Sequence, residues 1–90
     1  MYSNRNEDLI DYPCNFPIKV MGSANDVFAE IITEVVLEHD PVFDASTIET
    51  RSSSKGNYLS LTVIVHATSR TQLDQLYLAL SSHPMVKIVI

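Results

Sequence analysis

The polar stretch at residues 52–58, with the sequence SSSKGNY, holds the residues of this chain that are best suited to chemistry. Serine hydroxyls, a lysine ammonium group and backbone N–H groups in a turn can together hold a phosphate or another anion. A P-loop requires Gly-Lys-Ser/Thr running into a helix. Here Lys55 precedes Gly56, and an alternating strand pattern follows. This order excludes a P-loop and leaves an anion-binding or phosphoryl-transfer activity at the Lys55 loop as one alternative.

The same stretch also has the composition of a plain β-hairpin. Gly56 can take the positive φ that a short hairpin with a bulge requires, and Ser and Lys are common in solvated turns. Because a turn accounts for these residues without any ligand, we predict a hairpin first and a ligand site second. The candidate ligand-binding residues here are Ser53, Ser54, Lys55, Gly56, Asn57 and Tyr58.

Other chemistries lack the residues that they need. An RNA-recognition motif requires aromatic side chains after its Lys-Gly pair, and this chain has Asn57 and Leu59 at the first two of those positions. The three histidines, His39, His66 and His83, are expected on different elements, so no acid–base pair, nucleophilic triad or cluster of metal ligands can be assembled. We therefore predict that the protein is not an enzyme and uses no catalytic residue, metal or cofactor.

The length and charge of the chain narrow its class. Ninety residues make one domain, which we place at residues 15–90, after a polar and flexible tail at residues 1–14. The net charge of −5 and the dispersed Lys and Arg residues disfavour nucleic acids and anionic membrane surfaces as partners. The N-terminus does not resemble a signal peptide, and no apolar stretch is long enough to span a bilayer. With a single cysteine, Cys14, the chain is predicted to be cytoplasmic.

Hydrophobic periodicity predicts six elements. In order they are a strand at 16–21, a helix at 24–39, a short strand at 46–52, a strand at 58–67, a helix opened by Ser69, and a strand at 85–90. Ser23 with Asp26, and Ser69 with Gln72, are expected to cap the two helices. The order βαββαβ with right-handed crossovers predicts an α+β ferredoxin-like sandwich. Its four-stranded antiparallel sheet has the order 4-1-3-2, with both helices on one face.

Charged residues suggest two surfaces for a partner. Asp26, Glu30, Glu34 and Glu38 recur every four residues of the first helix, which contains no Lys or Arg; we call these four residues the acidic ridge. The acidic ridge either docks a basic partner or keeps the protein soluble. The uncovered side of the sheet is expected to mix apolar and charged side chains, on which a ligand, peptide or second copy could lie. The candidate partner-binding residues are Glu30, Glu34, Glu38, Lys19 and Arg51.

The last strand, MVKIVI at residues 85–90, is expected at an edge of the sheet with unpaired backbone groups. Alternation places Val86, Ile88 and Ile90 on one side of this strand, and Lys87 and Val89 on the uncovered side. Homodimerisation through this edge is a further hypothesis.

Four segments resemble the YbeD-like family of small uncharacterised bacterial proteins. They are FPIKVMG at 16–22, SSKGNYLSLTVIVHATS at 53–69, LDQLYLAL in the second helix and VKIVI at the end. The similarity runs from about Asp11 to Ile90. In some members a His follows the Tyr of the second segment, where this chain has Leu59, so no role for that His transfers. The resemblance implies a ferredoxin-like fold similar to regulatory ACT domains.

ACT domains bind small metabolites, often amino acids, beside the glycine loop after their first strand. By this resemblance the corresponding ligand-binding candidates are Gly22, Ser23, Asn25 and Asp26. We expect a non-enzymatic, ACT-like regulatory or adaptor module that binds a protein partner, since no enclosed polar pocket is evident from the sequence. A small-metabolite sensor that binds at the loop after the first strand is the main alternative.

Overall fold

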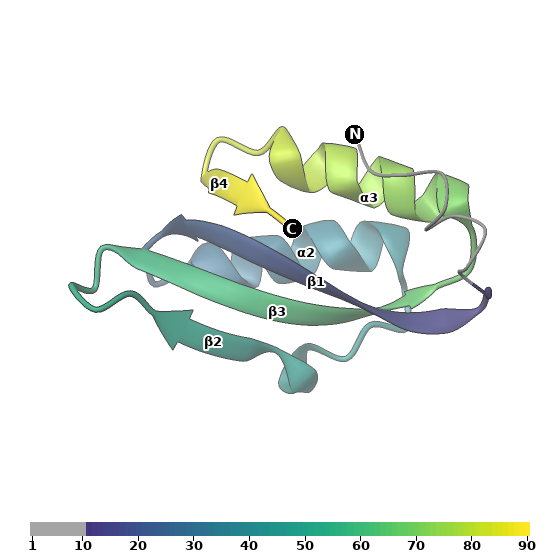
Figure 1. The fold of residues 1–90 in the computed structure, drawn as a ribbon, viewed down its shortest axis with the longest axis horizontal. Coiled ribbons are helices and arrows are strands. Elements are labelled where there is room, and N and C mark those ends of the chain that lie inside the picture. Colours follow the sequence, from purple (N-terminus) through teal and green to yellow (C-terminus); the bar gives the residue numbers. More distant parts are fainter. Residues whose placement is uncertain (1–10) are drawn as a thin grey trace.

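The computed structural model describes residues 11–90, so the first ten residues of the expected tail lie outside the described part. In this part the elements are β1 (Cys14–Ser23), α2 (Phe28–His39), the 3-10 helix η1 (Ala45–Thr47), β2 (Glu49–Ser52), β3 (Tyr58–Ala67), α3 (Arg70–Ser81) and β4 (Val86–Val89) (Figure 1). Neither α-helix within residues 11–90 has the length and apolar character that crossing a membrane requires.

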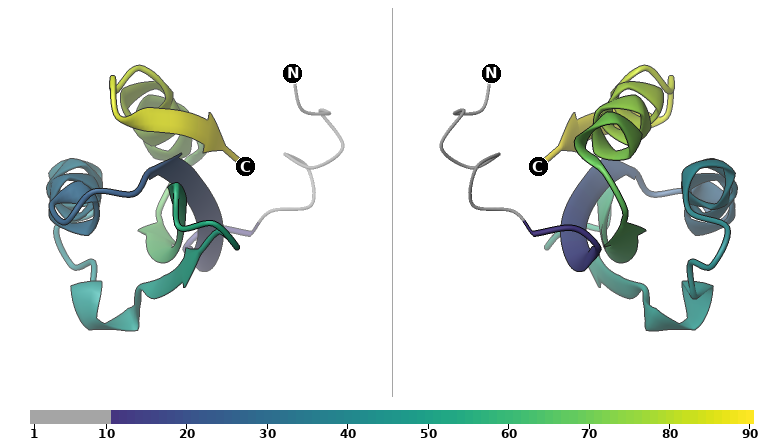
Figure 2. Two further views of the ribbon diagram at one scale, coloured as in Figure 1. Left: turned by 90° about the vertical axis from the view of Figure 1, so that its left-hand side faces the viewer. Right: turned by 90° about the vertical axis from the view of Figure 1, so that its right-hand side faces the viewer.

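The four strands form one antiparallel sheet in the order β2-β3-β1-β4. Both helices lie on the same side of this sheet, and no helix or strand of residues 11–90 covers its other side (Figure 2). The central strands β1 and β3 pair along their whole length, from Cys14 opposite Ala67 to Ser23 opposite Tyr58. The predicted ferredoxin-like fold and strand order are confirmed.

The core lies between the sheet and the two helices. Inward residues of β1 and β3 alternate with outward ones, as a sheet with one covered face requires. The core side chains with no exposed surface are Ile18, Val20, Phe28, Ile32, Val36, Leu61, Val63, Val65, Ala67, Leu76 and Leu80. Tyr12 and Cys14, which the sequence assigns to the tail, also pack against this core. Tyr12 and Cys14 therefore belong to the folded domain and not to the tail.

The start of α2 differs from the prediction. Ser23 is the last residue of β1 and not a helix cap, and α2 begins at Phe28. The Asn25 side-chain oxygen accepts a hydrogen bond from the Val27 N–H (3.0 Å), which makes an Asx turn between strand and helix. Ser23 was the wrong choice because helix caps and turns favour the same residue types.

The start of α3 agrees with the prediction, since Ser69 Oγ accepts a hydrogen bond from the Gln72 N–H (3.1 Å). The Gln72 side chain accepts from the N–H of Thr68 (2.6 Å). Its amide nitrogen also donates to the carbonyl oxygens of His39 (2.8 Å) and His66 (3.1 Å). One side chain therefore ties the start of α3 to the end of α2 and to β3.

A β-bulge changes the predicted last strand. The residues opposite each other across β1 and β4 are Val20 and Val89, Met21 and Ile88, and Gly22 and Val86. Lys87 is thus an extra residue on β4. Val86 and Val89 both pack against the core, whereas Ile88 and Ile90 are exposed. The prediction that Val86, Ile88 and Ile90 share a face was wrong because the bulge interrupts the period of two.

Candidate functional site

The β2–β3 hairpin is built around Ser53 and Gly56, which confirms the predicted hairpin. Ser53 Oγ accepts hydrogen bonds from the N–H groups of Asn57 and Tyr58, both at 3.1 Å. The Gly56 N–H donates to the Ser53 carbonyl oxygen (2.9 Å), and Gly56 has a φ of 72°. Ser54 and Lys55 are exposed at the tip. A ligand-binding role of this hairpin stays a prediction.

The two sets of candidate ligand-binding residues meet at one end of the sheet. The Ala24 N–H donates to the Asn57 carbonyl oxygen (3.0 Å), and Ser23 lies opposite Tyr58. We call this surface, residues 22–26 and 53–58, the loop end. Apart from Gly22, all its residues are exposed. The sequence could not show this proximity because the two stretches are about thirty residues apart.

Gly22 itself is buried beneath its neighbours. A Cβ atom built on Gly22 would lie 2.3 Å from the Met85 carbonyl oxygen and 2.6 Å from the Phe28 ring. Protein atoms therefore occupy the space beside this glycine. The Asn25 side-chain oxygen already accepts a hydrogen bond from Val27, so the polar groups of this loop that remain available to a ligand are the Asn25 amide nitrogen and the exposed Ser23 and Asp26 side chains.

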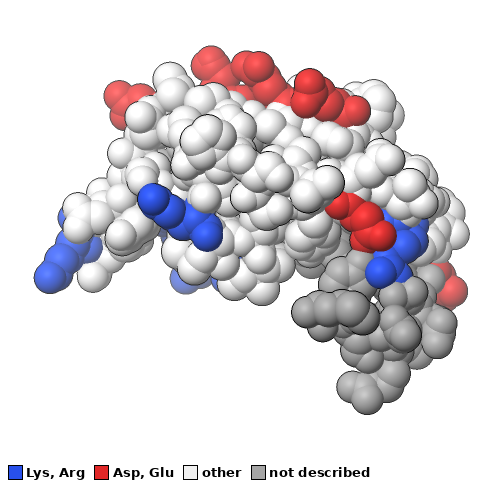
Figure 3. All heavy atoms as spheres, turned by 90° about the horizontal axis from the view of Figure 1, so that it is seen from above, with Lys and Arg blue, Asp and Glu red and all other residues white. Residues whose placement is uncertain are grey.

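The candidate partner-binding residues lie on two separate surfaces. Glu30, Glu34 and Glu38 are exposed on α2. Figure 3 shows a row of acidic side chains along one border of the molecule, with no Lys or Arg among them. Lys19 and Arg51 are exposed on the uncovered side of the sheet. The structure does not bring these two sets together.

We call the uncovered side of the sheet the open face. It consists of Asn15, Pro17, Lys19, Met21, Glu49, Arg51, Tyr58, Ser60, Thr62, Ile64, His66, Ile88 and Ile90. Lys19 lies opposite Thr62 on β3 and exchanges two backbone hydrogen bonds with Ile90 (2.8 and 3.1 Å). Because of the bulge, Ile88 and Ile90 belong to this face, whereas Val89 faces the core.

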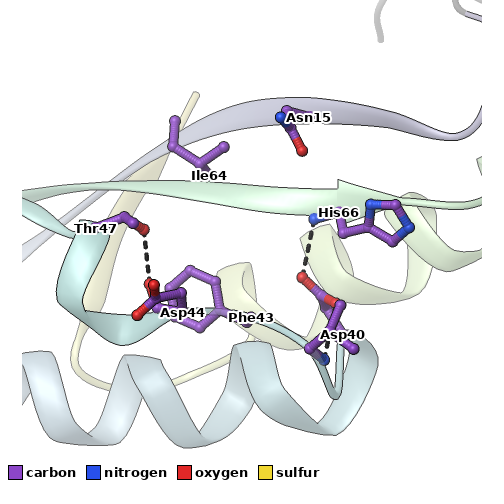
Figure 4. Close-up of a pocket in the computed structure, with 8 residues that line it drawn as sticks. Asn15, Asp40, Phe43, Asp44, Thr47, Ile64 and His66 are labelled. Atoms are coloured by element: carbon purple, nitrogen blue, oxygen red, sulfur yellow. Dashed lines mark hydrogen bonds between the residues drawn. The ribbon is translucent and has the colours of Figure 1, made fainter.

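A pocket of about 340 Å³ lies between β3 and the connection from α2 to β2 (Figure 4). Its lining residues are Asn15, Asp40, Val42, Phe43, Asp44, Thr47, Ile64 and His66. Figure 4 shows Asp40 and His66 at one end, Asp44 and Thr47 at the other, and the Phe43 ring between them. The sequence analysis missed this pocket because its residues come from three separate stretches.

Asp40 is buried at one end of this pocket, with 1% of its surface exposed. Its carboxylate accepts hydrogen bonds from the N–H groups of His66 (2.9 Å) and Val42 (3.3 Å). It therefore satisfies the N–H group of His66, which lies on a part of β3 that β2 does not reach, because β2 begins at Glu49 opposite Thr62. The position of Asp40 directly after α2 could have identified it from the sequence, because the helix dipole disfavours a carboxylate at a helix C-terminus unless another group stabilises it.

Asp44 supplies the second carboxylate of the pocket. Its Oδ1 accepts hydrogen bonds from the Ser46 hydroxyl (2.6 Å) and the Ser46 N–H (3.0 Å). These two bonds hold the pKa of Asp44 below its ordinary value, and the bond from the Ser46 hydroxyl contributes more than the bond from the Ser46 N–H. None of the lining residues is Lys or Arg. The pocket therefore has a negative character.

The histidines have separate surroundings. His39 Nδ1 lies 3.0 Å from the Val35 carbonyl oxygen, and His83 Nδ1 accepts a hydrogen bond from the Met85 N–H (3.2 Å). His66 lines the pocket. Within residues 11–90, no three His, Cys, Asp or Glu residues gather in a way that could hold a metal ion.

Comparison with known proteins gives consistent matches. A family described as "Protein of unknown function (DUF493)" matches residues 7–90. A "UPF0250 protein" of Janthinobacterium sp. (strain Marseille) is 66% identical over 84 residues, which cover 93% of this chain and 92% of that protein. A "UPF0250 protein" of Paraburkholderia phytofirmans is 57% identical over 88 residues, 98% of this chain and 99% of that one.

Among solved structures, the solution structure of protein HP0495 from H. pylori superposes with a TM-score of 0.76. The match covers 100% of this chain and 94% of the other, at 18% sequence identity. At this identity the likeness concerns the fold alone.

Proposed function

The chain belongs to the DUF493 family of proteins of unknown function, in agreement with its YbeD-like resemblance, and we propose that it is a non-enzymatic, ACT-like regulatory or adaptor module that binds a protein partner through the open face. The small ferredoxin-like fold supplies the scaffold. The regulatory role, the absence of catalysis and the cytoplasmic location are parts of this proposal. The candidate partner residues Lys19 and Arg51 lie on the open face.

The apolar surface of the open face carries the proposal. Eight large apolar side chains of residues 11–90 are exposed, and four of them are on this face: Tyr58, Ile64, Ile88 and Ile90. The other four are scattered over separate elements: Val27 just before α2, Leu37 on α2, Val42 in the connection after it and Leu78 on α3. Exposed apolar side chains that share one face indicate an interaction site more than apolar side chains scattered singly over several elements do.

The layer structure points to the same surface. A sheet normally buries an apolar face against another layer, and here the helices cover only one side (Figure 2). A partner element on the open face would complete a third layer. Ile88 and Ile90, which are 49% and 68% exposed, would then lose apolar surface to the partner in place of water.

Charge indicates what kind of protein fits. Among its thirteen positions, the open face has Lys19 and Arg51 but only one acid, Glu49. Lys87 is exposed on the neighbouring bulge of β4. Three residues of the acidic ridge, Glu30, Glu34 and Glu38, lie on α2, away from this face, and Asp26 lies in the turn before α2 and not in the helix as predicted. We therefore expect an apolar partner surface with acidic residues, because complementary charge favours encounter and register.

Docking on the face is favoured over pairing at an edge. β2 and β4 have four residues each, and β4 carries the bulge at Lys87. Short edge strands, bulges and edge lysines are devices that obstruct edge-to-edge pairing. The hypothesis of a homodimer through the β4 edge stays a prediction.

Affinity capture from a host lysate, with the full chain as bait, tests the proposal. The bait variants are Ile88→Ser/Ile90→Ser on the open face and a control, Val27→Ser/Leu78→Ser. The control residues match the tested ones in exposure, at 45% and 67%. Both variants should unfold at temperatures close to that of the wild type, because surface substitutions usually change stability by less than about 0.5 kcal/mol.

We expect the wild type and the control to capture one acidic protein. Once purified, this protein should bind the open-face variant at least about tenfold more weakly than the wild type, because central apolar contacts are lost. Lys19→Glu should weaken the same complex. Equal capture by the open-face and control variants would refute the open face as the binding surface.

A further inference from the structure

We propose that the pocket between β3 and the α2–β2 connection is a binding site for a small organic cation, a primary amine attached to a compact apolar group. The volume of about 340 Å³ lies at the lower end of the range of small-molecule sites. The site is at the opposite end of β3 from the loop end, since His66 pairs with Asn15 and Tyr58 pairs with Ser23.

The buried charge of Asp40 is the first argument. Buried carboxylates are normally paired with a cation as well as hydrogen-bonded. Asp40 is 1% exposed and receives two backbone N–H groups, whereas the ion pair that the structure shows among residues 11–90 joins Arg70 to Asp74 on α3. The Asp40 carboxylate is closed off from solvent, so a ligand in the pocket does not touch it. Its negative charge attracts a cation there through the intervening protein, where the effective dielectric constant is low.

Asp44 adds a second charge in a form that a ligand can use. Both hydrogen bonds from Ser46 end on Oδ1, which leaves the lone pairs of Oδ2 available. An Asp carboxyl group is ionised at neutral pH, and the hydrogen bonds from Ser46, which lower the pKa of Asp44, further favour this charged form. With two carboxylates and no Lys or Arg in the lining, the pocket attracts a cation and repels an anion.

The remaining lining residues determine the rest of the ligand. Phe43 is 8% exposed and Ile64 38% exposed, and together they give an apolar wall for a ring or a short aliphatic group. A protonated amine can also lie over an aromatic face such as that of Phe43. Asn15 and His66, opposite each other across β1 and β3, supply polar groups at the rim.

The test is an NMR titration of the ¹⁵N-labelled full chain with benzylammonium chloride, and in parallel with sodium benzoate. Both probes have a phenyl ring, so they differ chiefly in the sign of the charge. Benzylammonium should shift the amide signals of Val42, Asp44, Thr47 and His66 in a saturable way. A dissociation constant of about 1 mM is reasonable for a probe of this size. Benzoate should bind at least about tenfold more weakly.

Two pocket variants and one control variant locate the effect in the pocket. Asp44→Asn should weaken benzylammonium binding roughly five- to tenfold, because the rim carboxylate becomes neutral. Asp26→Asn removes the same charge from the loop end and should change nothing. Val42→Lys, at a position that is 72% exposed, should abolish binding by placing a competing ammonium group at the pocket. Equal binding of the two probes, or an equal effect of Asp44→Asn and Asp26→Asn, would overturn the proposal.

Because Ile88 and Ile90 do not line the pocket, Ile88→Ser/Ile90→Ser should bind benzylammonium like the wild type. The Ile88→Ser/Ile90→Ser variant therefore tests the partner-binding proposal, and Asp44→Asn tests the amine site, so either proposal can fail without the other.

Discussion

The two glycines of this chain stand in its two most recognisable motifs and are required for opposite reasons. Gly22 closes the segment KVMG on β1, where a Cβ would come within 2.3 Å of the Met85 carbonyl oxygen and 2.6 Å of the Phe28 ring. Gly56 lies in SSKGNY, where a Cβ would meet nothing within 4 Å. Its φ of 72° belongs to the left-handed region, which residues with a side chain adopt only at a cost. Gly22 is needed for space and Gly56 for backbone conformation.

This difference shows how the loop end is held. On the β1 side, tertiary packing leaves no room for a side chain, because Phe28 of α2 and the segment before β4 close over Gly22. On the hairpin side, local hydrogen bonds to Ser53 define the turn, and the tip remains in solvent. The contact from Ala24 to Asn57 joins a closely packed region to a solvated one.

Gly22→Ala should have the largest effect. The new methyl group would clash with a backbone carbonyl that cannot move without displacing β4, so we expect a loss of about 3 kcal/mol in the free energy of unfolding, at the upper end of overpacking costs. Urea denaturation would show a lower midpoint with an unchanged m-value.

A double mutant tests the reason for this loss. Phe28→Leu shortens the side chain that the new methyl group meets, so it should cost less in the Gly22→Ala background than in the wild type, with a coupling of about 1 kcal/mol. Strict additivity of the two changes would contradict the clash with the ring.

Gly56→Ala should cost about 1–1.5 kcal/mol in urea denaturation, because an alanine must adopt the left-handed conformation although it has ample space. Gly56→Asn should cost less, since asparagine tolerates this conformation better. If alanine and asparagine were equally destabilising, the contrast between space and conformation would not hold for this position.

Ser53→Ala should have the smallest effect of the three substitutions, about 0.5–1 kcal/mol. It removes the acceptor of two N–H groups that water can reach, so that solvent replaces much of the lost bonding. Thermal unfolding measures the change. The neighbouring Lys55→Ala, at the exposed tip, is the control and should leave the unfolding temperature unchanged within error.

The sequence by itself determined the parts of the fold that depend on near neighbours in the chain. Alternation in β3 places Leu61, Val63 and Val65 inward, because successive side chains of any strand point to opposite sides. Ser69 caps α3 through the Gln72 N–H only three residues away. Gly56 takes a positive φ within its own turn. Each of these features follows from chain geometry over a few residues.

Only the tertiary structure decided the features that join distant residues. The bulge at Lys87 depends on how β4 fits against β1, and it moves Ile88 and Ile90 to the open face. The pocket and the burial of Asp40 arise because β2 begins only at Glu49, opposite Thr62, and the chain before it passes beside the rest of β3. Gly22 is crowded by Phe28 and Met85, which only folding brings there. Register and burial depend on partners from other strands and helices, and a period read along one segment contains no information about them.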